Sequence, residues 1–235
     1  GIRDRDVTGV QTCALPIFSR AATALSYSYI RHQFSTDINI KLSMYGTEFI
    51  KSFGDHCEVA GDRPDLGFQE NGYLYTVDER NRDTLIENHE RQKGLGADVT
   101  LQTPGQLAER FPWLNPVGVA IGNLGQTGEG WFDNTGLMQG MRNKARSLGV
   151  DYVVDSVVAL GRDGDQVTSV TLASGRTITC DYVVNAAGPW ANDVCGMAGV
   201  DIPVEPRKRC IFVFSCREEM PSGMPAVIAP NGVFC

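Results

Sequence analysis

The segment with the clearest chemical potential is an apolar run that ends in small residues, YVVNAAGPW at 182–190. The run Tyr182–Ala187 is typical of a buried strand, and it leads into Gly188, Pro189 and Trp190. A glycine at such a point lets another molecule come within contact of the main chain. Ligands of open α/β sheets lie outside the carboxyl ends of the strands. We therefore treat this strand end as a candidate ligand site, with a tightly packed, ligand-free turn as the alternative.

A second glycine-rich string, GEGWFD at 128–133, matches a phosphate-binding loop only in part. Gly128 and Gly130 fit the GxGxxG pattern, but Asp133 occupies the third glycine position, and the strand-then-helix phasing is missing. We interpret the string as an interdomain loop. Glu129 and Asp133 are close in sequence, and we expect them to serve the loop and cap the next helix rather than act as acid and base.

The cysteines and histidines do not have the spacing of a metal site. The chain has seven Cys and three His, with no CxxC pair and no His at zinc-finger spacing. We expect no metal and a reducing, cytoplasmic setting, because a disulfide framework is unusual in a chain of this size. His32 could act as a base, but a lone histidine is more often a bystander. We assign no role to His56 or His89.

Composition narrows the class of partner. Hydrophobic residues make up 42% and charged residues 21% of the chain, which is ordinary for a globular protein, and the formal net charge is −7. An acidic chain binds polyanions poorly, so we expect no nucleic-acid partner. No apolar run is long enough to span a bilayer, so we expect no transmembrane segment.

The first residues look foreign to any fold. Gly1–Asp4 and Val7–Ile17 can be back-translated into the two constant arms of a common sequencing-library adapter, with Arg5–Asp6 filling the barcode gap. The alternative is a natural leader, but the apolar stretch is short and no small-residue cleavage site follows it. We interpret residues 1–17 as an artifact and exclude them from the fold.

Hydrophobic spacing and punctuation residues predict the elements that would position the site. Helices are expected at Asn39–Phe53 with a stop at Gly54, at Leu85–Gly94, at Pro104–Phe111 after the start signal Thr103, and at 132–150 with capping residues Asp133, Asn134 and Thr135 and a stop at Gly149. Strands are expected at 72–77, 117–122, 151–160, 166–172 and 177–187, and the last three are joined by the glycine-containing turns 161–165 and 173–176.

Five strings in this order resemble one known family. They are TALSYSYIRHQFST (23–36), GYLY (72–75), GEGWFDNTGLMQGMRNKARSLGV (128–150), VVNAAGPWA (183–191) and IPVEPRKRCIFVF (202–214). Together they resemble the FAD-dependent amine oxidoreductases, the group of D-amino acid oxidase, glycine oxidase and the sarcosine and dimethylglycine oxidoreductases. No single motif is diagnostic, but the resemblance covers nearly everything from Ser19 to Cys235.

The resemblance implies a mixed α/β (α+β) fold in which a Rossmann-like FAD domain is interleaved with a substrate domain built on an antiparallel sheet. The FAD domain would take residues 18–58 and 126–200, and the substrate domain would take 59–125 and 201–235. The family's N-terminal βαβ unit with its GxGxxG loop would precede Ser19, and the chain would stop within a strand. By this resemblance we expect an internal fragment, truncated at both ends.

The resemblance also implies which residues hold FAD. Thr23, Ser26, Ile30 and Arg31 match the stretch beside the flavin, Val157 matches the position whose backbone meets the adenine, and Ala187, Gly188 and Trp190 match the segment that passes the ribityl and pyrophosphate groups. Many relatives have glycine where this chain has Ser28 and Tyr29, which leaves open how closely the backbone approaches the flavin. Arg31 is the candidate catalytic residue, because a fixed cation would stabilise reduced flavin. The alternative for Arg31 is a surface salt bridge.

The implied activity is oxidation of the CH–NH bond of a small amino acid or N-methylated amino acid, bound as its free amine, by hydride transfer to flavin N5. An electron acceptor or a second subunit would be a further partner. Fold does not fix function. The alternatives are therefore a catalytically idle flavin-binding assembly protein and one subunit of a heteromeric dehydrogenase.

Overall fold

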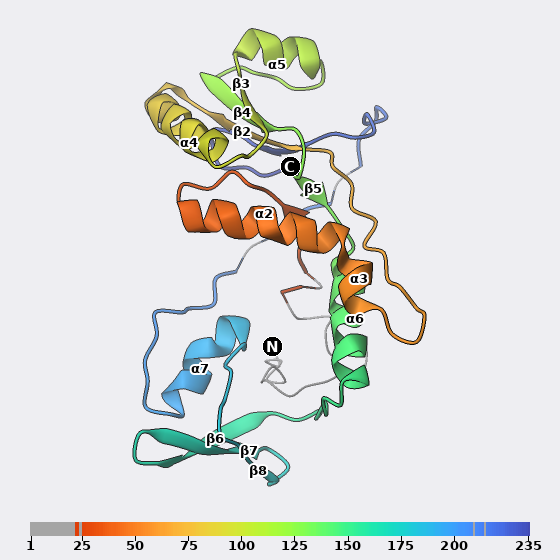
Figure 1. Ribbon diagram of the computed structural model, residues 1–235. Helices are drawn as coiled ribbons and strands as arrows, with labels where there is room; N and C mark the ends of the chain where they lie inside the picture. Colours follow the sequence, from red (N-terminus) through yellow and green to blue (C-terminus); the bar gives the residue numbers. More distant parts are fainter. Residues whose placement is uncertain (1–21, 24, 209, 214) are drawn as a thin grey trace. The chain divides into compact units, whose positions relative to one another are not determined.

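The computed structural model describes residues 22–23, 25–208, 210–213 and 215–235 (Figure 1). The chain forms two compact units. One comprises Ser26–Met141 and Cys216–Cys235, and we call it the cavity unit. The other comprises Arg142–Ser215 together with the described residues up to Leu25, and we call it the meander unit. These limits differ from the expected division into FAD and substrate domains, which concerns where ligands bind and stays a prediction.

The cavity unit is built on a four-stranded sheet with the strand order β3-β4-β2-β9. The strands are β2 (Tyr73–Val77), β3 (Val99–Gln102), β4 (Ile121–Gly125) and β9 (Ala226–Ile228). β4 pairs antiparallel with both β2 and β3, and β9 pairs parallel with β2. A separate two-stranded ribbon joins β1 (Tyr29–Ile30) to β5 (Gly130–Trp131), with Tyr29 opposite Trp131.

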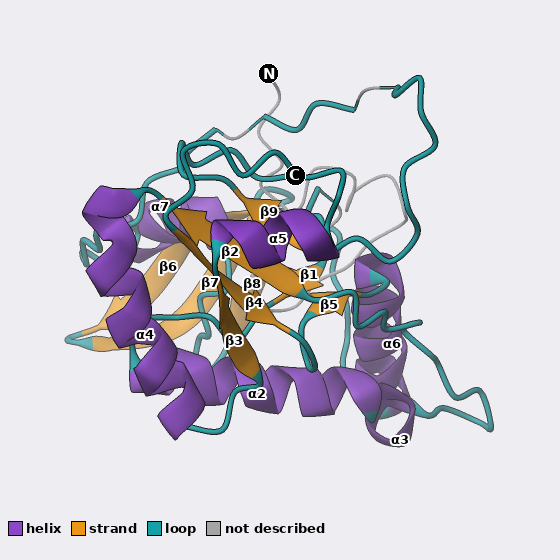
Figure 2. Ribbon diagram, turned by 90° about the horizontal axis from the view of Figure 1, so that it is seen from above, coloured by secondary structure: helices purple, strands orange, loops and turns teal. Residues whose placement is uncertain are grey.

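Helices cover both faces of this sheet. They are α4 (Arg82–Gly94, after the 3-10 turn η1 at Glu79–Asn81) and α5 (Pro104–Arg110). The unit also contains helices α2 (Asp37–Lys51) and α3 (Phe53–Cys57). On one face, Leu107 of α5 packs with Leu74 and Leu124. On the other face, Leu85 of α4 packs with Val77. Leu74 and Val77 of β2 therefore face different helices, because successive residues of a strand point to opposite faces. Helices α4 and α5 lie beside the sheet in Figures 1 and 2.

The predicted helices of this unit are confirmed, with one corrected end. α5 begins with a full capping box, in which the Thr103 hydroxyl accepts from the Gln106 N–H and the Gln106 side chain accepts from the Thr103 N–H. The predicted stop at Gly54 is wrong: α2 breaks at Ser52, and Gly54 lies inside the short helix α3. The burial of Phe53 beside Ile50 keeps the chain helical past the break.

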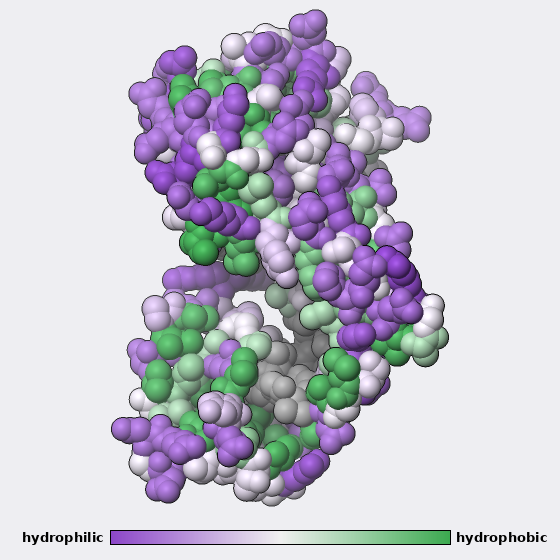
Figure 3. Space-filling model, viewed as in Figure 1, coloured by the Kyte–Doolittle hydropathy of each residue, from purple (hydrophilic) through white to green (hydrophobic). Residues whose placement is uncertain are grey.

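Helix α2 also presents apolar side chains to solvent. Ile40 and Ile50 are buried, whereas Ile38, Leu42 and Tyr45 are exposed. Hydrophobic groups also appear among polar ones on the face of the molecule drawn in Figure 3. The apolar residues of α2 therefore do not all face the core.

The strand predicted at 117–122 is displaced. A turn closed by the Val119 N–H and the Pro116 carbonyl occupies its first half, and Gly118 adopts the left-handed conformation there, with φ of +82°. β4 therefore starts only at Ile121. The predicted strand at 72–77 is confirmed as β2.

The meander unit contains a three-stranded antiparallel sheet with the order β6-β7-β8. Its elements are β6 (Val157–Asp163), β7 (Gln166–Leu172), β8 (Thr177–Thr179), the 3-10 turn η2 (Gly188–Trp190) and α7 (Ala191–Gly196). Helix α6 (Asn134–Ser147), predicted with its cap, contains the point where the chain passes from one unit to the other. Both predicted glycine-containing turns are present at Gly164 and Gly175.

The strand predicted at Tyr182–Ala187 is wrong. The segment is irregular, and the side chains of Tyr182 and Val184 are 90% and 74% exposed. A strand needs a neighbour to satisfy its backbone groups, and none of the described strands pairs with this segment. The mixed α/β fold class is nevertheless confirmed. Among the described residues, no helix has the length and apolarity needed to cross a membrane.

The close approach of β5 to the 69–70 segment generates a stability prediction. A Cβ at Gly130 would overlap the backbone carbonyl of Gln69, whereas a Cβ at Gly94 in α4 would meet nothing within 4 Å. We expect Gly130→Ala to lower the free energy of unfolding by at least about 2 kcal/mol. The control Gly94→Ala should leave it unchanged or raise it by up to about 1 kcal/mol. Urea unfolding followed by circular dichroism measures both, and equal losses would contradict this packing.

Candidate active site: a buried carboxylate behind an arginine-lined cavity

The cavity unit contains a polar cavity of about 400 Å³. Arg31 and Gln33 line it from the segment after β1, and Tyr75 and Thr76 line it from β2. Helix α4 and the segment after β9 supply further walls. The cavity is large enough for a small amino acid and is lined by donors and acceptors.

Aromatic rings surround the Arg31 guanidinium. Its carbon lies 4.9 Å from the centroid of Phe34, 5.4 Å from that of Tyr73 and 5.7 Å from that of Tyr75. Among the residues that the structure describes, no carboxylate forms an ion pair with it. The surface salt bridge considered as an alternative is therefore absent from the described part of the chain. A guanidinium stays charged at any physiological pH, so an anionic group is its natural ligand.

Glu129 lies behind this segment and is completely buried. Its Oε1 accepts from the backbone N–H of His32 at 2.6 Å, and its Oε2 accepts from Nε2 of Gln33 at 2.9 Å. Burial raises the pKa of the Glu129 carboxyl to about 7, against the lowering effect of the bonds from Gln33 and His32 and of the Arg31 charge. Glu129, expected to serve the loop, is instead buried, and its residue type gave no signal of this.

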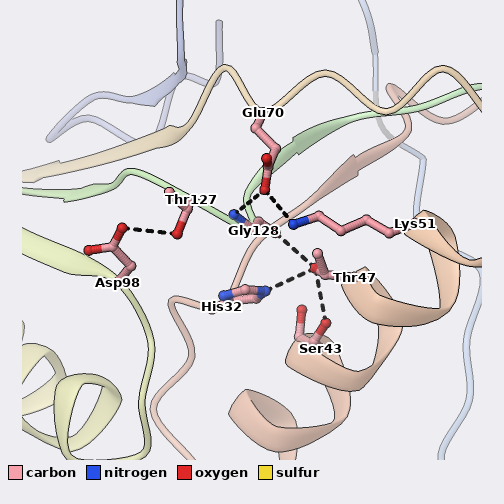
Figure 4. Close-up of polar contacts among 8 residues, drawn as sticks. All are labelled: His32, Ser43, Thr47, Lys51, Glu70, Asp98, Thr127 and Gly128. Atoms are coloured by element: carbon pink, nitrogen blue, oxygen red, sulfur yellow. Dashed lines mark hydrogen bonds and ion pairs between the residues drawn. The ribbon is translucent and has the colours of Figure 1, made fainter.

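The loop that carries Glu129 is fastened from several sides (Figure 4). The Gly128 N–H donates to Oε1 of Glu70 at 2.8 Å, and Glu70 pairs with Lys51 at 2.8 Å. The hydrogen bond from Lys51 and then that from Gly128 hold the pKa of Glu70 below its ordinary value. On the other side, the Thr127 hydroxyl donates to Asp98 at 2.9 Å.

His32 packs against this loop in one defined tautomer. The Thr47 hydroxyl donates its hydrogen to the Gly128 carbonyl at 2.8 Å, so it must accept from Nε2–H of His32 at 2.9 Å (Figure 4). Burial lowers the pKa of His32, which keeps the ring neutral at pH 7. A Cβ at Gly128, where φ is +74°, would run into the imidazole. His32 is therefore a packed residue, as predicted.

The residues predicted to lie beside the flavin divide between the two units. Ser26, Ile30 and Arg31 belong to the cavity unit, and Thr23 belongs to the meander unit. The Ser26 hydroxyl accepts from the N–H of Ser28 at 3.0 Å, and Ser28 has a φ of +59°. A non-glycine residue in that conformation is strained. Glycine adopts this conformation without strain.

Tyr29 lies within an aromatic cluster. Its ring meets those of Tyr73 and Phe234 edge-on, with centroids 6.3 and 6.2 Å away. Burial raises the pKa of the Tyr29 hydroxyl, and it also raises that of Tyr73, where the nearby Arg31 acts in the opposite direction.

The other predicted cofactor residues lie in the meander unit. Val157 and Ala187 are buried, and Trp190 ends η2. Gly188 has a φ of +53°, and a Cβ built there would meet nothing within 4 Å. Its main chain is therefore open to a close approach. The predicted roles of these residues stay predictions.

Asp133 caps helix α6, as predicted. The Asp133 carboxylate accepts from the Gly136 N–H at 2.9 Å, which makes it the cap of α6. Among the described residues, no group of His, Cys, Asp and Glu could hold a metal ion.

The burial of Glu129 predicts a pH dependence of stability. A pKa raised from 4.5 to about 7 means that the folded state favours the protonated acid. The protonated Glu129 contributes fully to the free energy of unfolding below about pH 4.5, and this contribution is lost as the pH rises through 7. At about 1.4 kcal/mol per pKa unit, the loss is about 3 kcal/mol. Glu129→Gln cannot ionise, so its stability relative to wild type should rise by about that amount between pH 4.5 and pH 8. Urea unfolding of both proteins at the two pH values measures the difference, and a pH-independent difference would refute the assignment.

Comparison with known proteins identifies the family to which this chain is similar. Residues 16–234 match the model of the FAD dependent oxidoreductase family, DAO. The chain is 34% identical over 249 residues to FAD-dependent oxidoreductase domain-containing protein 1 of Xenopus laevis, covering 93% of this chain and 50% of that protein. The chain spans about half the length of the curated relatives it matches.

Solved structures share the fold at low sequence identity. L-proline dehydrogenase from P. horikoshii superposes with a TM-score of 0.70 at 21% identity, over 90% of this chain and 56% of that one. Iminodiacetate oxidase from Chelativorans sp. BNC1 superposes with a TM-score of 0.66 at 21% identity, over 91% of this chain and 58% of that one. The fold, the order of the motifs and the extent of the family match together show that this chain belongs to the DAO family of FAD-dependent oxidoreductases.

Proposed function

We propose that this chain is part of an enzyme that oxidises the CH–NH bond of a small amino acid or N-methylated amino acid. The observation that carries the proposal is the Arg31 guanidinium, which lines a cavity of amino-acid size without a carboxylate partner among the described residues. Structural neighbours named as a proline dehydrogenase, a glycine oxidase and an iminodiacetate oxidase support this class of substrate.

FAD would be held by the residues that the family resemblance indicates. These are Thr23, Ser26, Ile30, Arg31, Val157, Ala187, Gly188 and Trp190, of which Gly188 offers the open main chain. When bound, FAD supplies the chemistry, because it accepts a hydride from the substrate carbon. The protein contributes orientation and charge.

Arg31 would bind the substrate carboxylate. A guanidinium presents paired N–H donors that match the two oxygens of a carboxylate. The rings of Phe34, Tyr73 and Tyr75 hold the side chain in place, so little conformational freedom is lost on binding. The earlier prediction, in which Arg31 stabilises reduced flavin, gives a different kinetic signature, and the two can be separated.

Anaerobic reduction of the flavin tests the activity. Sarcosine, glycine, proline and dimethylglycine are added in turn to the purified holoprotein without oxygen, and the flavin absorbance is recorded. Bleaching by at least one of these amines is expected. If no amine bleaches the flavin, the protein is a catalytically idle flavin-binding protein instead.

Substitution of Arg31 tests its role. Arg31→Gln removes hydrogen bonds to a charged group and should raise KM for the amino acid about 10- to 150-fold, with a smaller change in kcat. Arg31→Lys keeps the charge but not the paired donors, so its KM should lie between those of the wild type and of Arg31→Gln. Arg80→Lys, at an exposed arginine paired with Asp78, is the control and should change neither constant. A loss confined to kcat would instead place Arg31 beside the flavin.

A further inference from the structure

The Gln33 side chain has one buried atom that forms no hydrogen bond with any residue that the structure describes. Gln33 is 6% exposed, and its Nε2 donates to the Tyr73 carbonyl at 2.7 Å and to Glu129 Oε2 at 2.9 Å. Its Oε1 is buried and has no hydrogen-bond partner within the described part of the chain. Buried acceptors without a donor are rare in folded proteins, because each loses its bonds to water without replacement.

The network fixes which way the amide faces. A carbonyl such as that of Tyr73 can only accept, so the NH₂ group of Gln33 must point toward it. Turning the amide over would set two oxygens against each other. The orientation of Oε1 is therefore imposed by Tyr73 and Glu129.

The same contacts make Oε1 a better acceptor. Donation from Nε2 to the Glu129 carboxylate and the Tyr73 carbonyl polarises the amide, and bonds in such chains strengthen one another. Gln33 lines the cavity that Arg31 also lines. The residue that carries this acceptor and an arginine without a carboxylate partner among the described residues thus line one cavity.

We propose that Oε1 of Gln33 accepts a hydrogen bond from the amino group of the substrate while Arg31 holds its carboxylate. The identity of the substrate class rests on the proposed function. The pairing selects amino acids that keep an N–H as free amines, namely primary and secondary amines. A tertiary amine such as dimethylglycine loses its only N–H when it becomes the free base, and it would leave Oε1 unpaired. A site built around such a bond rejects an analogue that lacks the donor.

A pair of ligands that cannot be oxidised isolates this contact. 2-Aminoisobutyrate has no hydrogen on its α carbon, and pivalate has the same shape with a methyl group in place of the amino group. Both carry the carboxylate that Arg31 would bind. Calorimetric titration of the wild-type holoprotein, at a pH where the amine of 2-aminoisobutyrate is free, should show this ligand binding about tenfold more tightly than pivalate, the upper part of the range expected for a hydrogen bond between neutral groups.

Substitution of Gln33 assigns the preference to this residue. Gln33→Met keeps the length of the side chain and removes Oε1, so the preference for 2-aminoisobutyrate over pivalate should fall below about threefold. Loss of the Nε2 bonds to Tyr73 and Glu129 acts on the affinity for both ligands alike, so the ratio of the two affinities is the quantity compared. Gln69→Met, the same change at an exposed glutamine outside the cavity, should keep the full preference. A Gln33→Met protein that still prefers 2-aminoisobutyrate would overturn the proposal. The wild-type protein also tests it without any variant, because equal affinity for the two ligands, or binding of neither, overturns it.

This test fails separately from the proposed function. Binding is measured with ligands that are never turned over, whereas flavin bleaching by oxidisable amines measures the reaction. A tenfold preference without bleaching would support the role of Gln33 and refute the oxidation. Bleaching without a preference would support the oxidation and refute the role of Gln33.

Discussion

The structure of the candidate site depends on one constraint, the burial of the Glu129 carboxylate. A buried carboxylate is tolerated only if donors surround it. The backbone N–H of His32 and the amide of Gln33 provide those donors. The chain just after β1 is thereby fixed in place, and Arg31, the residue before His32, is fixed with it. The cavity wall is shaped by a group that does not itself line the cavity.

The opposite side of the same loop is held by independent contacts. Gly128 is bound through its N–H to Glu70 and through its carbonyl to Thr47, and it can approach the His32 ring only because it lacks a Cβ. Carboxylate and loop therefore support each other: the loop carries Glu129 inward, and Glu129 anchors the strand end against which the loop packs. Such mutual support is typical of functional sites whose side chains must be held within fractions of an ångström.

Much of the fold could be predicted from the sequence, because its signals are local. The start of α5 at Thr103–Pro104 and the cap of α6 at Asp133 follow from the side chains at those positions. The irregular conformation of residues 182–187 could not be predicted. Their apolar composition is typical of a strand, but composition does not reveal whether a neighbouring strand is present to pair with the segment. The burial of Gln33 and Glu129 could not be predicted from the sequence either. Their residue types suggest a solvated surface, and their burial arises from three segments distant in the sequence that meet at one point.

The parallel pairing of β9 with β2 has a consequence for synthesis of the chain. Tyr73 of β2 pairs with Ala226, so that edge of the sheet waits for about 150 further residues to be made. At ribosomal rates of about 5–20 residues per second, the wait is on the order of ten seconds. During that time the nascent chain exposes an open, partly apolar strand edge to the translating cell. The edge would be a natural point of capture for chaperones that bind emerging polypeptides.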